Sequence, residues 1–448
     1  MKRIFALLAV LGCLTALYGC VPAAQEPSAV PSTAETAPAA DPVAAGLPLY
    51  LPSPDTARGT YNTGLAEKEN TGLYFLDYAS AENRILCSKP GCSHDSDACE
   101  GRFLSDESVR GVYALQDGAI VYGVSEGING PTMLWLAESD GSERRELASI
   151  DRLGQVLCAD AENIYVVQWM EEVERGYYGR VLRVSLADGA VTPQAELPEG
   201  SPQYFLGVSG REVLAWQIQW EQIPPLNIPE DTTEEEARVL NDAYEEELNK
   251  TEAEHRVFLW SPDTGEQRDV TTWTSHYGST GRTVLWDGGR LYWCSDNRPD
   301  DLHWMTPDGQ TGELAVAWPE EIPYSQGETI FYLERMLPGR LLLTVWGPWG
   351  IDRIQRYALD LESGAVQECP LEYVSNASER PIMILAQGEK ELAVAFAEQR
   401  QQVEYIDADG ELATTEAVHT RTGVISFEDF LSGNPDYREI TQEDGKTE

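Results

Sequence analysis

The sequence predicts an all-β fold made of repeated four-stranded antiparallel sheets. The shortest clear copy of the repeat consists of Val284–Cys294 followed by Leu302–Leu314. Each half contains two short apolar runs joined by a Gly-containing turn, which is the pattern of a β-hairpin. Two hairpins in series form a four-stranded sheet, which buries little by itself and needs neighbouring copies. A ring of such copies is a β-propeller.

The spacing of the copies supports this architecture. Glycines that close successive hairpins, from Gly141 to Gly410, are 48, 76, 44, 55 and 46 residues apart. A period near fifty residues is typical of propeller blades, and removing an insertion of about 30 residues restores the outlier.

The second hairpin of the unit recurs seven times, so we expect seven blades, with six or eight as alternatives. The copies begin at Leu73, Met133, Val181, Val257, Leu302, Ile354 and Val403. First hairpins precede six of them, at residues 112–124, 156–169, 205–216, 284–294, 331–346 and 382–396. The copy at Leu73 lacks a first hairpin. Its missing strands are expected from residues 47–61, from residues 424–427, or from both, which would close the ring.

The chain begins with an export signal. Lys2 and Arg3 precede an apolar run, Ile4–Leu17, of 14 residues, which is short for a membrane span and suits a signal peptide over residues 1–19. The run ends in Leu17-Tyr-Gly-Cys20, which resembles a bacterial lipobox. The resemblance implies that Cys20 is the lipidated mature N-terminus, anchored on the extracytoplasmic face of the bacterial cell membrane. Ordinary cleavage with a free secreted product is the alternative.

Residues 20–46 are expected to be a tether. They contain Pro, Ala, Ser, Thr and a few acids with no aromatic residue, so they cannot bury enough apolar surface to fold. The propeller domain is then expected over residues 47–441, followed by a frayed tail over 442–448.

One insertion, residues 221–255, differs in kind from the blades. Thr233-Glu-Glu-Glu236 has the pattern of a capping box, and Ala237, Leu240, Tyr244 and Leu248 follow at helical spacing. The helix is expected to pack its apolar stripe on an adjacent blade; covering one mouth of the ring or binding a partner are alternatives. A second, short helix is expected within Ser426–Gly433, stopped by its glycine.

A cluster of potential metal ligands follows the first hairpin. Cys87, Cys92, His94 and Cys99 have the spacing C-x4-C-x-H-x4-C, within residues 87–99. Pro90-Gly91 fits the centre of a type II turn, which would bring Cys87 and Cys92 together. Three thiols and one imidazole suit a closed, structural zinc site. Two alternatives remain: a disulfide between Cys99 and either other cysteine, because the protein is exported, or three reduced, unliganded thiols.

The segments around this cluster resemble a known group of proteins. Leu73–Tyr78, the Cys/His cluster and Ile425–Tyr437 are similar to uncharacterised lipoproteins of clostridial Firmicutes. Those proteins are assigned to β-propeller domains of unknown function, likened to low-density lipoprotein receptor-related repeats. The resemblance implies a propeller and a cell-surface location over roughly residue 48 to the end, and no known activity.

Motifs that would indicate an enzyme are absent from the sequence: there is no G-x-S-x-G elbow, H-E-x-x-H pair or P-loop. Cys158, Cys294 and Cys369 are expected to be buried free thiols, and the scattered histidines 255, 276, 303 and 419 to be surface or packing residues. Trp346 and Trp349 lie in a Gly/Pro run, where they would pack between blades or stack on a ligand. Carboxylates in the channel could form a catalytic pair, but sequence cannot pair them.

The formal charge of −43 excludes nucleic acid as a favoured partner. These observations together predict a membrane-anchored, extracytoplasmic propeller that binds an unknown surface ligand or protein without catalysis. One alternative is a carbohydrate-active hydrolase or lyase that uses channel carboxylates. Another is a structural accessory subunit of an envelope complex, with the acidic helix as its contact.

Overall fold

A computed structural model gives the structure of one compact unit, Leu47–Glu448, within which short segments are left undescribed. The described residues are 47–65, 72–94, 98–103, 107–127, 130–172, 176–200, 204–221, 226, 228–229, 232–276, 280–296, 299–319, 330–346, 354–375, 380–406 and 412–442. The predicted signal peptide, the lipidation site Cys20, the tether and Trp349 all lie outside them. Among the described helices, none is both long and apolar enough to cross a membrane.

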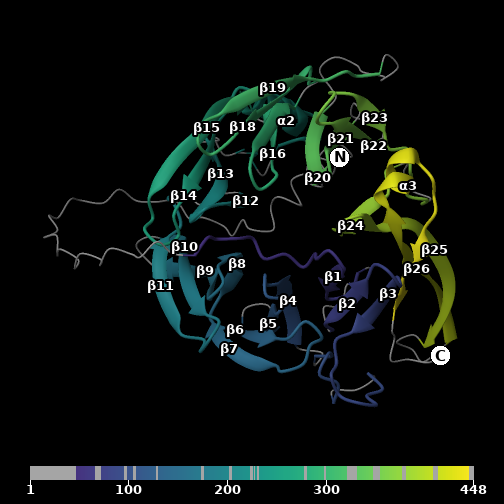
Figure 1. Ribbon diagram of the computed structural model, residues 1–448. Helices are drawn as coiled ribbons and strands as arrows, with labels where there is room; N and C mark the ends of the chain where they lie inside the picture. The colour runs from purple at the N-terminus through teal and green to yellow at the C-terminus, as the bar shows by residue number, and fades with distance from the viewer. Residues whose placement is uncertain are drawn as a thin grey trace, which may run out of the picture. The chain divides into compact units, whose positions relative to one another are not determined.

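Seven four-stranded sheets are arranged around a centre, which confirms a seven-bladed β-propeller (Figure 1). The closing blade has the order β1 (Gly59–Asn62), β2 (Tyr74–Asp77), β3 (Glu82–Ile85) and β28 (Thr441–Gln442). The next three blades are β4 (Glu107–Ala114), β5 (Ile120–Glu126), β6 (Thr132–Ala137), β7 (Arg145–Ile150); β8 (Leu153–Ala159), β9 (Asn163–Glu172), β10 (Gly176–Ser185), β11 (Val191–Glu196); and β12 (Tyr204–Ser209), β13 (Glu212–Trp220), β14 (Glu252–Trp260), β15 (Gln267–His276). The last three are β16 (Arg282–Trp286), β17 (Leu291–Ser295), β18 (Asp301–Met305), β19 (Thr311–Ala315); β20 (Ile330–Leu337), β21 (Arg340–Trp346), β22 (Ile354–Asp360), β23 (Val366–Glu368); and β24 (Met383–Gln387), β25 (Glu391–Ile406), β26 (Leu412–Ser426), β27 (Arg438–Glu439).

The hydrophobic core lies between neighbouring blades. One cluster joins Cys158 and Tyr165 of the β8–β11 blade to Ala215 and Phe258 of the β12–β15 blade, all at most 1 % exposed. The first strands of several neighbouring blades also contact one another, including β12 with β16 and β16 with β20. A four-stranded sheet therefore buries its faces against its neighbours, as the sequence repeat requires.

Strands from both ends of the chain complete the closing blade. β1 comes from the N-terminal side, where it overlaps the end of the predicted residues 47–61, and β28 comes from the C-terminal side and pairs with β3 in parallel. The C-terminal contribution is not residues 424–427, because these belong to β26 and to the start of the following helix. Gln442, which was expected in the frayed tail, is the last residue of β28 and pairs with Asn83 of β3.

The residues before β1 bind along the ends of other blades. Leu49 N–H donates to the Gly210 carbonyl at 2.8 Å, Tyr50 pairs with Ala159, and the Ala114 N–H donates to the Ser53 carbonyl at 2.9 Å. The N-terminal segment thus ties three blades together before it enters the closing blade.

The last blade corrects one hairpin assignment. Residues 403–406, expected to form a third strand, are the end of β25, which pairs with β26 in register from Glu391–Ser426 to Ile406–Leu412. Asp409-Gly410, expected to close the outer hairpin, instead falls between the second and third strands and outside the described residues. Apolar runs separated by turn residues cannot reveal that a strand continues through Gln399–Gln402.

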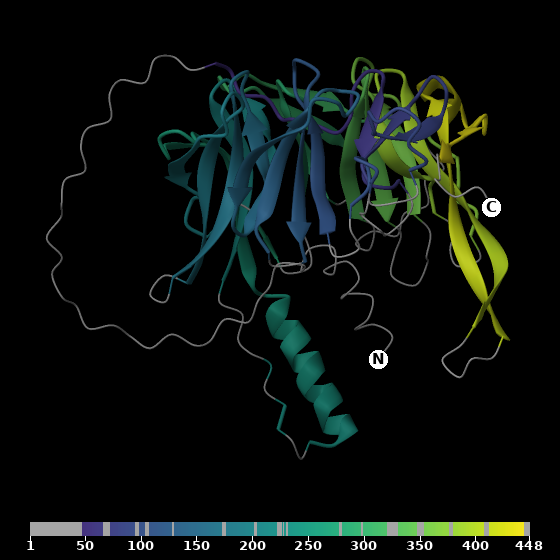
Figure 2. The same ribbon diagram turned by 90° about the horizontal axis from the view of Figure 1, so that it is seen from below.

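The predicted helices form, but the longer one does not pack as expected. α2 (Glu234–Leu248) begins with the predicted capping box of Thr233 and Glu236. It extends away from the ring (Figure 2), and Val239 and Leu240 are 57 % and 39 % exposed, whereas Leu248 is buried. The apolar stripe is therefore not packed on a blade, because the helix meets the propeller only near its C-terminal end. α3 (Phe427–Ser432) is capped by Ser426 and ends at Gly433 in a left-handed conformation.

Candidate metal centre

The Cys/His cluster lies in the segment that connects the closing blade to the next blade. Cys87 follows β3 after one residue, and the segment of residues 86–103, described except for 95–97, leads towards β4. It is fastened to the blade by the Leu86 N–H bond to Leu73 O and the Leu73 N–H bond to Gly101 O, at 2.8 and 2.9 Å. The cluster packs on Tyr74 and Ile85, which are paired across β2 and β3.

The predicted turn between Cys87 and Cys92 is present. Gly91 has φ +70°, and the Cys92 N–H donates to the Lys89 carbonyl at 3.3 Å. Only a residue without a Cβ adopts this φ at no steric cost, which is why the sequence has Pro-Gly at the centre.

The four predicted residues are brought together. Their ligand atoms, three Sγ and one imidazole nitrogen, all lie within 4.8 Å of one another. Within the cluster, His94 Nδ1 and Cys99 Sγ lie 3.3 Å apart. Tetrahedral zinc bound at about 2.3 Å by thiolates places its ligand atoms roughly 3.8 Å apart, so small side-chain movements suffice. Within the described residues this is the one group of three or more His, Cys, Asp or Glu with such geometry.

The local backbone supports thiolate chemistry at one cysteine. Burial raises the pKa of Cys87, but N–H groups of Lys89 and Glu100 and the neighbouring thiols outweigh it, so the pKa is lowered overall. Burial raises the pKa of Cys99 to about 12. The Gly101 N–H donates to the Cys99 sulfur at 3.4 Å, which lowers the pKa by a smaller amount. All three thiols are free, with no S–S bond among them. The group can therefore hold a metal ion, and metal binding would require Cys99 to lose its proton.

Side chains that the sequence did not single out hold the cluster in place. Arg102 Nε donates to the carbonyl of His94 at 2.6 Å, which fixes a residue with φ +58°. Arg144, from the turn between β6 and β7, donates to the carbonyls of Leu86, at 2.6 Å, and Glu100. The arginine thus links the cluster segment to the neighbouring blade. No spacing rule would have found these residues, because they act through backbone carbonyls across blades.

The other cysteines are packing residues, as predicted. Cys158, Cys294 and Cys369 are at most 4 % exposed, and burial raises the pKa of each. Trp346 is 39 % exposed at the end of β21 and packs edge-on to Tyr332, so it does not fill the space between blades.

His255 departs from a simple packing histidine. It is fully buried, stacked on Trp273 with ring centroids 4.8 Å apart, and its Nε2 lies 2.7 Å from Ser275 Oγ. Burial lowers its pKa to about 4. A Ser–His pair is a catalytic pattern, but Ser275 is only 7 % exposed, so a substrate has no access to it.

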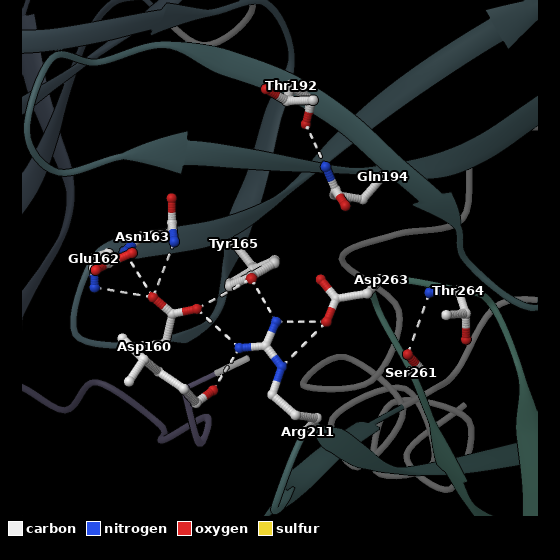
Figure 3. Close-up of polar contacts among 11 residues, drawn as sticks. Asp160, Glu162, Asn163, Tyr165, Thr192, Gln194, Arg211, Ser261, Asp263 and Thr264 are labelled. Carbon is white, nitrogen blue, oxygen red and sulfur yellow. Dashed lines mark hydrogen bonds and ion pairs between the residues drawn. The ribbon is translucent and has the colours of Figure 1, made fainter. Parts of the chain in front are cut away.

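Asp160 and Asp263 lie close together and both bind the side chain of Arg211 (Figure 3). Arg211 donates to Asp160 Oδ2 at 2.9 Å and to Asp263 Oδ2 at 2.5 Å, and also to Tyr165 OH at 2.8 Å. Backbone N–H groups and Arg211 outweigh burial and lower the pKa of Asp160. These carboxylates join two blades. Because both bind the same arginine, they cannot take the separate roles of proton donor and base that a glycosidase pair requires.

Comparisons with known proteins assign neither a family nor an activity to this chain. No family model matches the sequence, and no curated protein matches it. Solved structures that resemble the chain include one from a study of two prolyl endopeptidases, with 12 % identity, a TM-score of 0.45, and coverage of 86 % of this chain and 55 % of that one. TolB from Acinetobacter baumannii shows 14 % identity, a TM-score of 0.30, and coverage of 71 % and 64 %. The β-propeller domain of the Trilobed protease from Pyrococcus furiosus shows 10 % identity, a TM-score of 0.35, and coverage of 74 % and 97 %.

The chain thus spans a little over half the length of that endopeptidase. The similarity to clostridial lipoproteins stays a prediction, and what is established is that this chain is a seven-bladed β-propeller with a Cys/His group that could hold a metal ion.

Proposed function

We propose that the protein is a membrane-anchored, extracytoplasmic binding propeller whose Cys87, Cys92, His94 and Cys99 hold one structural zinc ion. The proposal for binding depends mainly on one observation: α2 and the β25–β26 hairpin extend from the same side of the ring (Figure 2). α2 connects the second and third strands of its blade, and the hairpin is formed by the second and third strands of the last blade.

The projecting elements expose apolar side chains that the propeller itself does not need. On the helix Val239 is 57 % exposed; on the hairpin Leu412 and Val418 are 71 % and 52 % exposed. Scattered exposed apolar residues are ordinary, but here they gather on elements that stand away from the core. Binding a protein or surface ligand through this side is the use that such elements fit best.

Photo-crosslinking in intact cells tests this proposal. A photoreactive amino acid replaces Val239 or Leu240 on α2, and a matched control replaces the exposed Val191 of β11, on the flank of another blade. Crosslinked products specific to the α2 positions are expected. Equal yields from Val191, or none from any position, would reject α2 as the binding element.

The proposal of a membrane anchor is supported by the basic residues Lys2 and Arg3, the apolar run that follows them and the lipobox-like Leu17–Cys20. The full chain, expressed in a bacterium fed an alkyne-labelled fatty acid, should carry the label and sediment with membranes. Cys20→Ala should lose both properties. A wild-type chain that is unlabelled and soluble would instead indicate a free secreted protein.

Structural zinc is supported by the donor set and its compactness, since four protein ligands complete the tetrahedral set of a structural zinc site. Zinc bound here would hold together a segment that otherwise depends on a few hydrogen bonds. Metal analysis with a free-thiol count on the purified full chain decides. About one zinc ion and no disulfide support the proposal, whereas no metal and one S–S bond would establish the disulfide alternative.

A further inference from the structure

The β25–β26 hairpin continues well beyond its blade as a ribbon of two strands. β24 pairs with β25 only as far as Ala395, and β27 pairs with β26 only at Gly423 and Val424. The pairing of β25 with β26 nevertheless runs on to Ile406 and Leu412. We call residues 397–406 and 412–422 the ribbon; Figure 2 shows it extending beyond the ring.

One edge of the ribbon is open for strand pairing. The last neighbour of β25 on the β24 side is Val374, whose carbonyl accepts from the Glu398 N–H at 2.9 Å. Among the described residues no strand pairs with this edge over residues 399–406. A two-stranded ribbon is marginally stable alone, and exposed edges usually carry Pro, Lys or a bulge. The ribbon contains no Pro or Lys, and the register shifts only at its start, between Ala395 and Ala397.

The charges on this edge are self-complementary. Arg400 and Glu404 lie two residues on either side of Gln402, so an antiparallel copy of the strand centred on Gln402 reverses their positions. Arg400 of each copy then lies opposite Glu404 of the other, on the same face of the sheet. The pairing is symmetric about a twofold axis, as an isologous interface requires.

Charge elsewhere on the chain opposes other modes of association between copies. The chain has a formal charge of −43, whereas residues 399–406 carry one arginine and one glutamate, a net charge of zero. A basic or neutral partner strand would gain less from the alternation of Arg400 and Glu404 than a second copy does.

We propose that two copies of this chain pair antiparallel through residues 399–406 of β25, forming a four-stranded sheet from two ribbons. The contact is independent of the zinc site, and it uses the edge of β25, whereas the exposed Leu412 and Val418 named above lie on β26. The shared edge is short, so the dimer is expected to be weak and to depend on ionic strength.

Charge reversal tests the proposal on the full chain carrying Cys20→Ala, which keeps lipids from associating the copies. Analytical ultracentrifugation should show a monomer–dimer equilibrium. Arg400→Glu and Glu404→Arg should each weaken dimerisation by roughly tenfold or more, because two opposite-charge pairs become two like-charge pairs. An equimolar mixture of the two variants should recover dimers, as should the double variant, because opposite charges again face each other.

A matched control separates the edge from general charge effects. Arg152 is 52 % exposed and pairs with Glu171 on the β8–β11 blade, much as Arg400 pairs with Glu416 on the ribbon. Arg152→Glu should leave the dimer unchanged. The proposal is overturned if the wild type is monomeric throughout, if Arg152→Glu weakens the dimer as much as Arg400→Glu, or if mixing the two ribbon variants restores nothing.

Discussion

The closing blade and the β12–β15 blade both pack between neighbouring blades, but their strands differ greatly in length. β1, β2 and β3 have four residues each and β28 has two, whereas β12 to β15 have six, nine, nine and ten. In the longer blade Val257–Trp260 are all fully buried. The blade with the least strand is also the one next to which the Cys/His cluster lies.

The difference indicates how each blade is stabilised. Long strands supply a buried core, and the hydrophobic effect of several fully buried side chains is worth many kcal/mol. The closing blade is joined from the two ends of the chain, and its outer strand covers only Glu82 and Asn83. A metal at the other end of β3 would compensate for that short outer strand.

The largest expected effect is therefore from the loss of one of the four proposed metal ligands. Cys99→Ser, or removal of zinc by a chelator, should destabilise the protein by roughly 4 kcal/mol, since structural zinc contributes folding free energy directly. Hydrogen exchange should increase first in residues 72–103. Cys158→Ala, a buried thiol of a long blade, is the control and should keep the metal. Unchanged exchange in the closing blade after metal loss would contradict this assignment.

Next in size is the arginine that ties the β12–β15 blade to its neighbour. Arg211→Met leaves Asp160, whose side chain is 4 % exposed, without its counter-ion, which should cost roughly 3 kcal/mol. Urea unfolding measures the loss. Replacing Arg268, which forms a more exposed pair with Glu212 at 3.3 Å, should cost less than about 1 kcal/mol. Equal costs would mean that the Arg211 network contributes no more than a surface pair.

The pH dependence of stability should show the buried histidine of the longer blade. The folded pKa of His255 is about 4 and its ordinary value is 6.5, so the unfolded chain binds a proton that the folded chain excludes. Stability is fully present above pH 6.5 and is lost as the pH falls towards 4. The loss between pH 7 and 5 should be roughly 2 kcal/mol.

His255→Gln should remove this component of the slope, measured by urea unfolding at both pH values. The control is His303→Gln, at a half-exposed histidine near Glu313. An unchanged slope in His255→Gln would show that other groups cause the acid sensitivity.

The smallest effect concerns α2, which is inserted between β13 and β14 of the longer blade and extends away from its sheet. Thr233→Ala removes the hydrogen bond to the Glu236 N–H and half of the capping box, which should cost about 1 kcal/mol of helix stability. Because α2 lies outside the core, the melting temperature of the propeller should not change, while circular dichroism loses some helical signal. A lower melting temperature would mean that the helix supports its blade.

The sequence by itself determined the repeat, the number of blades, the capping box of α2, the N-cap of α3 and the composition of the Cys/His cluster. These depend on local pattern: hairpin periodicity, Gly at turns, Ser or Thr at helix starts, and ligands within thirteen residues of one another. The missing first hairpin at Leu73 also indicated that one or both ends of the chain would complete a blade, and the structure shows that both do.

Only the tertiary structure decided which residues close the ring, where α2 points and how β25 continues. Two residues at Thr441 and Gln442 have no pattern to detect, and their strand exists because β3 offers an open edge. The apolar stripe of α2 predicted packing, but whether a helix meets a blade depends on the path of the connecting segments. Arg144 and Arg211 join consecutive blades through partners 58 and 51 positions away, and these carbonyls and carboxylates come together only after the sheets are stacked.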